Sequence, residues 1–91
     1  MKMRVIILNA EKLKERAAAH EYLKKLFGFP DYYGKNLDAL YDCLTDIQRP
    51  TTVIMTQSQS GGYAERIAQV IEEAAEKGRI KFIRAGKEAK Q

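Results

Sequence analysis

The chain has 91 residues, of which 45% are hydrophobic, and a formal net charge of +4 at pH 7. This size predicts one domain over residues 1–91, and the composition excludes an intrinsically disordered chain. No apolar run approaches the roughly 18 residues of a membrane span. The run Val5–Leu8 is also shorter than the ~7-residue minimum of a secretory signal. The single cysteine, Cys43, has no partner for an internal disulfide, so we expect a protein of the reducing cytoplasm.

The first third of the chain predicts a strand and then a helix. The β-branched run Val5–Leu8 is too short for a helix and is typical of a buried strand. Residues Leu13–Leu26 are rich in helix formers, and their apolar side chains repeat at helical spacing. We expect Gly28 to end this helix and Pro30 to prevent its continuation.

The next segment predicts a turn over Asp31–Gly34 and a helix over 36–47 with Asn36 as its N-cap. On a helical wheel of about 100° per residue, one arc holds four apolar side chains and the opposite arc three aspartates. These are Leu37, Leu40, Leu44 and Ile47 against Asp38, Asp42 and Asp46. The wheel places Tyr41 and Thr45 beside the aspartates and Cys43 nearer the core.

The second half predicts a strand at Thr51–Met55, a loop over 56–62, a helix over Tyr63–Glu76 and a strand at Ile80–Ile83. We expect residues 85–91 to form a frayed tail. The resulting β-α-α-β-α-β order predicts a two-layer α/β fold, with a three-stranded parallel sheet packed against about three helices.

Charge is distributed unevenly along this basic chain. Residues 31–48 hold one lysine and all four aspartates, whereas the segments before and after them are both net positive. Carboxylates four residues apart on a helix repel one another, and Asp46 near the helix C-terminus also opposes the helix dipole. A functional acidic face and an ordinary solvated face are both compatible with this pattern. The first interpretation predicts a cationic partner.

The segment PDYYGKNLDALYDCLTD, residues 30–46, resembles the signature of the barstar family, intracellular inhibitors of secreted bacterial ribonucleases. The leading ILNAEKL and the later AERIAQVIEEAAEKG also resemble parts of that family, so the similarity covers most of the chain. The resemblance implies a barstar-like fold and a non-enzymatic inhibitor, in which the acidic helix and the preceding loop block a barnase-like ribonuclease. It further implies a 1:1 complex formed by a monomer, with carboxylates in the place of RNA phosphates.

Carried over by position, the resemblance implies a set of partner-binding residues. Asp42 matches the central carboxylate, Asp38 a second acidic contact, and Tyr32 an aromatic that packs on the enzyme. The implied set is Tyr32, Asn36, Asp38, Tyr41, Asp42, Thr45 and Glu73. Asp46 is expected to extend the acidic field, and Asp31 to belong to the turn.

Several positions depart from the family pattern. Tyr41 stands where barstar has tryptophan, and Ile47 lies near a second tryptophan position. Lys35 and Lys77 each replace a glutamate. The segment Pro50–Ile67 is about five residues shorter than in barstar, which implies that a short third helix is missing.

Other reactive residues are expected to be structural. His20 is the only histidine and is expected to be a structural or solvated side chain. The ligand count excludes a structural zinc site, and we expect neither a metal nor a cofactor. Cys43 has no evident base beside it and is expected to be a small core residue. The pair Gly61–Gly62 lacks the Lys-Ser/Thr of a phosphate-binding loop.

Rival functions remain open at this point. An RNA-binding module would use the basic ends of the chain, including Arg79, Lys81, Arg84 and Lys87. No RNA-binding motif accompanies them. An adaptor for another basic protein would use the acidic face. A hydrolase is disfavoured, because the carboxylates on the helix lack a facing group that could share acid–base work.

Overall fold

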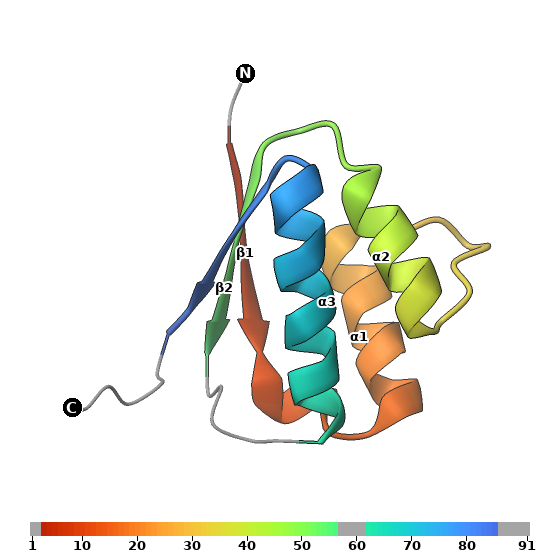
Figure 1. Ribbon diagram of the computed structural model, residues 1–91. Helices are drawn as coiled ribbons and strands as arrows, with labels where there is room; N and C mark the ends of the chain where they lie inside the picture. The colour runs from red at the N-terminus through yellow and green to blue at the C-terminus, as the bar shows by residue number, and fades with distance from the viewer. Residues whose placement is uncertain (1–2, 57–61, 86–91) are drawn as a thin grey trace.

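The computed structural model describes residues 3–56 and 62–85. The described residues form β-strands, a short 3-10 helix and α-helices (Figure 1). The elements are β1 (Arg4–Asn9), the 3-10 helix η1 (Ala10–Leu13), α1 (Arg16–Phe27), α2 (Leu37–Thr45), β2 (Thr51–Thr56), α3 (Tyr63–Lys77) and β3 (Ile80–Arg84). The predicted α/β class and the β-α-α-β-α-β order are therefore confirmed.

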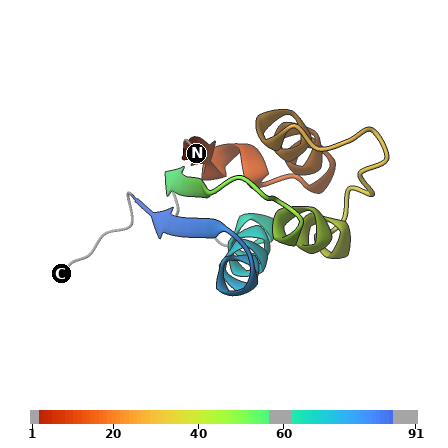
Figure 2. The same cartoon turned by 90° about the horizontal axis from the view of Figure 1, so that it is seen from above.

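The three strands form a parallel sheet in the order β1-β2-β3, with β2 in the centre. The view along the strands shows the three α-helices on the same side of this sheet (Figure 2). The predicted two-layer arrangement, with a three-stranded parallel sheet against three helices, is therefore confirmed. None of the described helices is both long enough and apolar enough to cross a membrane.

Strand β1 differs from the prediction of a buried strand. Ile6 and Leu8 are buried, whereas Val5 and Ile7 are 56% and 53% exposed. The prediction was wrong for this second face because no described helix covers it. A short apolar run does not reveal whether helices cover one side of a parallel sheet or both.

Helix α1 begins at Arg16 rather than at the predicted Leu13. Leu13 belongs to η1, where it is fully buried, and Glu15 then adopts an extended conformation and caps α1. The Glu15 carboxylate accepts hydrogen bonds from the backbone amides of Ala17 and Ala18. High helix propensity across the whole stretch concealed this break. The helix ends as predicted at Gly28, whose φ of +73° favours glycine.

The core lies between the sheet and the helix layer. Helix α2 contributes Leu40 and Leu44, which are fully buried, while Leu37 and Ile47 at its ends are partly buried. Helix α3 packs against both α2 and β3. Its buried side chains are Ala64, Ile67, Ala68, Ile71 and Ala74. This packing fixes the rotation of α2 about its own axis.

The different burial of two leucines of α2 predicts that their substitution by alanine lowers stability to different extents. Leu44→Ala should lower the free energy of unfolding by about 2–5 kcal/mol, because it leaves a cavity in the core. Leu37→Ala should cost no more than about half as much, since Leu37 is only partly buried. Urea unfolding monitored by circular dichroism measures both values, and equal losses would contradict this packing.

Candidate functional site

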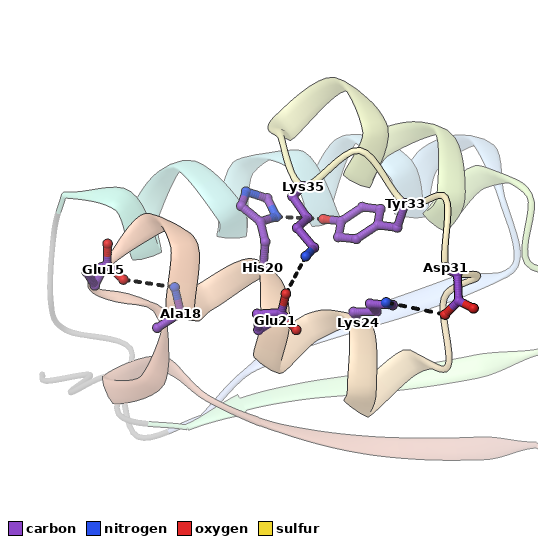
Figure 3. A network of polar contacts seen from close by, with 8 residues as sticks. All are labelled: Glu15, Ala18, His20, Glu21, Lys24, Asp31, Tyr33 and Lys35. Atoms are coloured by element: carbon purple, nitrogen blue, oxygen red, sulfur yellow. Dashed lines mark hydrogen bonds and ion pairs between the residues drawn. The ribbon is translucent and has the colours of Figure 1, made fainter.

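Three side-chain contacts attach the loop between α1 and α2, residues 28–36, to α1 (Figure 3), in addition to the backbone hydrogen bonds from Gly28 and Phe29 to Lys24. The Tyr33 hydroxyl lies 2.6 Å from Nδ1 of His20. Lys35 forms an ion pair with Glu21, and the Lys24 ammonium lies 3.5 Å from the Asp31 carboxylate. These contacts come from residues 20, 21 and 24, within one turn of α1, so the loop is held along its length.

Internal contacts give the loop a defined conformation. The Tyr33 amide donates to the carbonyl of Pro30, and the Tyr33 ring packs 4.8 Å from that of Phe29. Lys35 adopts a left-handed conformation with a φ of +58°, which is uncommon for a residue with a side chain. Tyr33 is only 4% exposed, whereas its neighbour Tyr32 is 87% exposed. The loop therefore buries one tyrosine and presents the other to solvent.

Helix α2 presents Asp38, Asp42 and Asp46 on its exposed side. Glu73 of α3 faces two of them across a groove of about 470 Å³. The groove is lined by Leu37, Asp38, Tyr41, Asp42, Val70 and Glu73. We call Asp38, Asp42, Asp46 and Glu73 the acidic face. Residues far apart in the chain thus combine carboxylates with an aromatic ring in one groove.

None of the described lysines or arginines lies within ion-pair distance of the acidic face. Asp38 lies in the first turn of α2, where the helix dipole favours it, but Asp46 is the C-cap residue, where the dipole disfavours a negative charge. No direct ion pair within the described part of the chain therefore offsets these negative charges. This arrangement suits a cationic partner.

A second hollow, of about 300 Å³, lies on the loop side of α2. Its polar lining includes Asp42, Asp46 and Tyr32, and its remaining lining is mainly apolar. The remaining residues are Phe27, Gly28, Phe29, Pro30, Cys43 and Ile47. Asp42 also lines the groove beside α3, so it stands between two concave surfaces. A partner side chain with an aliphatic stem and a cationic end would fit beside it.

The structure gives local roles to two of the predicted contact residues. Asn36 caps α2, because its side-chain oxygen accepts a hydrogen bond of 2.7 Å from the Ala39 amide. The Thr45 hydroxyl donates to the carbonyls of Tyr41 and Asp42, at 3.0 and 3.1 Å. Thr45 lines neither of the two hollows described above, whereas Tyr32, Asp38, Tyr41, Asp42 and Glu73 each line at least one.

Sequence reasoning missed the cationic end of this surface. Arg16 and Arg66 line a third hollow, of about 270 Å³, together with Asp38, Asn36 and Tyr63. Arg16 and Arg66 belong to α1 and α3, and neither residue lies near α2 in the sequence. The sequence could indicate that both arginines lie on exposed faces of helices. Only the packing of these helices shows that both arginines border Asp38.

Arg84, one of the basic residues of the rival RNA-binding surface, is engaged in contacts within the protein. Two guanidinium nitrogens of Arg84 donate to the Glu65 carboxylate, at 3.1 and 2.8 Å, and Glu72 lies 3.7 Å away. The hydrogen bond to Glu65 raises the pKa of Arg84. Arg84 therefore joins β3 to α3, while Lys87 lies outside the described residues. Arg79 and Lys81 remain exposed.

Other predicted features fall partly outside the described residues. Residues 57–61, which include most of the predicted loop and Gly61, lie outside the described residues, so the expected absence of a short third helix between Pro50 and Ile67 stays a prediction. Of the predicted tail, only Ala85 is described, and its amide donates to the Met55 carbonyl. Cys43 is partly buried, and burial raises the pKa of its thiol, which disfavours the nucleophilic thiolate. The described residues contain no group of three or more His, Cys, Asp or Glu arranged to hold a metal.

Comparison with known proteins agrees with this architecture. Residues 3–86 match the family described as Barstar (barnase inhibitor). The chain belongs to the barstar family. It is also 38% identical over 86 residues to a Bacillus subtilis (strain 168) protein described as "Putative ribonuclease inhibitor YrdF", covering 88% of this chain and 94% of that protein.

Barstar family membership confirms the resemblance found in residues 30–46. The structure shows where the residues that depart from the family pattern lie. Lys35, at a glutamate position of the pattern, pairs with Glu21 instead of adding to the acidic face. Tyr41 lies in the groove between α2 and α3, and Ile47 lies in the hollow beside the loop. Lys77 is exposed at the last residue of α3.

The N-cap of α2 predicts that two variants of Asn36 differ in stability. Asn36→Ala should lower the free energy of unfolding by about 1 kcal/mol, because the Ala39 amide loses its acceptor. Asn36→Asp retains a capping oxygen and should change stability by only a few tenths of a kcal/mol. Urea unfolding tests this difference, and equal stabilities of the two variants would show that the cap contributes nothing.

Proposed function

We propose that this barstar-family chain inhibits a barnase-like ribonuclease by placing the acidic face in the cationic active site of the enzyme. Family membership and the description of the Bacillus subtilis relative support an inhibitory role. The observation that carries the mechanism is the group of carboxylates without an ion-pair partner among the described residues, arranged around the groove between α2 and α3. The proposed role requires binding but no catalysis.

The chemistry of a ribonuclease active site explains why carboxylates would suit it. Such an enzyme uses cationic side chains to hold phosphates and to stabilise the charge that develops in the transition state. Carboxylates can replace phosphate oxygens as acceptors of short, charge-assisted hydrogen bonds. Asp42 is proposed as the central contact, since it lies between the groove and the second hollow, with Asp38 and Glu73 beside it.

The loop is proposed to add apolar contact at the edge of the complex. Tyr32 offers a large exposed ring on a segment that is already attached to α1. A rigid aromatic side chain buries much area while losing little conformational entropy, which favours binding. We propose that Tyr41, Asn36 and Thr45 complete the contact surface of a 1:1 complex.

Removing the central carboxylate tests the mechanism directly. Asp42→Ala should raise the Kd for barnase by at least about a hundredfold, because it leaves a cationic group of the enzyme buried without its partner. Asp42→Asn should show most of this loss, since it keeps the shape and removes the charge. The matched control is Glu11→Ala, which removes a carboxylate of η1 that pairs with Lys14. Inhibition by Asp42→Ala equal to that by the wild type would refute the assignment.

The negative charges of the acidic face, which no described ion pair offsets, predict that association with the ribonuclease depends on salt. The association rate with barnase should fall by at least about tenfold between low salt and about 0.5 M salt, because ions screen the attraction between exposed charges. Replacing Asp38, Asp42 and Asp46 together by Asn should make this dependence shallower. Stopped-flow fluorescence measures the rates. A salt dependence that is unchanged in the triple variant would show that the acidic face does not direct the encounter.

A further inference from the structure

We propose that Arg16 and Arg66 form a cationic subsite that binds an Asp or Glu side chain at the rim of the ribonuclease active site. We call these two arginines the cationic end. The inference rests on the proposed function, because it concerns another part of the same contact with the ribonuclease. A subsite of this kind would favour ribonucleases that carry an acidic residue beside their cationic cleft.

The cationic end lies in a hollow of about 270 Å³ at the first turn of α2. Arg16 belongs to α1 and Arg66 to α3, and the hollow is completed by Asn36, Leu37, Asp38 and Tyr63. Leu37 and Asp38 also line the groove that Glu73 borders, so the hollow and the groove adjoin. A partner seated on Asp38 therefore lies next to the cationic end as well.

Neither arginine has an ion-pair partner among residues 3–56 and 62–85. The carboxylates next to them in the chain are engaged elsewhere, since Glu15 caps α1 and Glu65 binds Arg84. Both arginines are exposed. Their guanidinium groups can therefore reach a carboxylate of another protein.

An aromatic ring restrains the position of Arg16. Its guanidinium lies over the ring of Tyr63, 6.0 Å from the ring centroid, in a cation–π contact. Tyr63 is held in turn, because its hydroxyl lies 2.6 Å from Nε2 of the fully buried His20. A cation that is already positioned loses less conformational entropy when it binds a partner.

All three α-helices begin at this end of the molecule (Figure 1). Helix α1 starts at Arg16, α2 at Leu37 and α3 at Tyr63. The N-terminal end of a helix carries a partial positive charge, so the three helix ends add to the potential of the arginines. The groove of the acidic face and the hollow of the cationic end are therefore adjoining surfaces of opposite sign.

The chemistry of the occupant follows from what a complex would cover. A cationic active site seated on Asp38 would bring positive charge toward Arg16 and Arg66 and displace water from them. Burial of a charged group without a partner is unfavourable, so the enzyme needs an anionic group opposite the cationic end. The planar guanidinium group pairs well with a carboxylate, which makes an Asp or Glu side chain the suitable group.

An RNA phosphate suits the same hollow less well. A strand of RNA carries a negative charge at every nucleotide, so a strand that reached the arginines would also pass close to Asp38 and the adjoining acidic face. Like charges would repel one another there. A single carboxylate on a folded protein can meet the arginines without this repulsion.

Removal of the two positive charges tests the subsite in the complex. Arg16→Gln and Arg66→Gln keep part of the aliphatic stem, and each should raise the Kd for barnase about two- to fivefold, and both together about tenfold. General attraction to a cationic enzyme predicts the opposite sign, since loss of positive charge would then strengthen binding. The matched control is Arg79→Gln, which removes an exposed arginine outside the hollow and should not raise the Kd. Binding by the double variant as tight as that by the wild type, or tighter, would overturn the proposal.

Double-mutant cycles identify the acidic partner residue. Each exposed Asp and Glu of barnase is replaced by Ala in turn and measured against the Arg16→Gln and Arg66→Gln variants. One acidic position should couple to the cationic end by at least about threefold in Kd. The absence of coupling at every acidic position would contradict a carboxylate in this hollow.

A titration without any ribonuclease tests the subsite separately from the proposed function. Tetra-glutamate at low salt should shift the NMR amide signals of Leu37 and Tyr63, whereas tetra-glutamine should not, and the Arg16→Gln/Arg66→Gln double variant should show no shift. A short single-stranded RNA that binds the wild type more tightly than tetra-glutamate does, and not the double variant, would overturn the choice of a carboxylate. Failure of the wild type to bind barnase, with the peptide response intact, would refute the proposed function and support the carboxylate site. The absence of a peptide response, with inhibition that depends on Asp42, would refute the cationic subsite alone.

Discussion

The burial of Leu40 and Leu44 orients the aspartates of α2. Both leucines are fully buried, and α2 packs on α3. Because an α-helix repeats every 3.6 residues, burying these positions turns Asp38, Asp42 and Asp46 to solvent. The direction of the carboxylates is thus a consequence of core packing. No additional contact is needed to orient them.

This arrangement has an electrostatic cost within the free protein. Like charges at i,i+4 destabilise a helix by a few tenths of a kcal/mol per pair, and the C-cap position of Asp46 adds an unfavourable interaction with the helix dipole. The apolar side of α2 and the cap by Asn36 offset that cost. A cationic partner would relieve the repulsion, which makes the same charges a source of affinity in a complex.

The α1–α2 loop shows how local chemistry maintains a surface next to that helix. Lys35, Tyr33 and Asp31 each contact a different residue of α1. The Lys35–Glu21 pair is about half exposed and contributes little by itself, so the buried Tyr33 contact is the stronger restraint. Lys35 keeps its unusual left-handed backbone in this setting. Lys35, which departs from the family pattern, therefore has a structural role within the loop.

The α/β class, the strand–helix order and the opposite arcs of leucine and aspartate on α2 could all be predicted from the amino-acid sequence, because hydrophobic periodicity and turn residues act over a few positions. The sequence also contained the family signature in residues 30–46. Three other features become visible only when the chain is packed: Val5 and Ile7 face solvent, Glu73 borders the groove of Asp38 and Asp42, and His20 joins Tyr33 to Tyr63. These features depend on which segments pack together, and contacts between residues 13 and 43 positions apart leave no periodic signal in a single sequence.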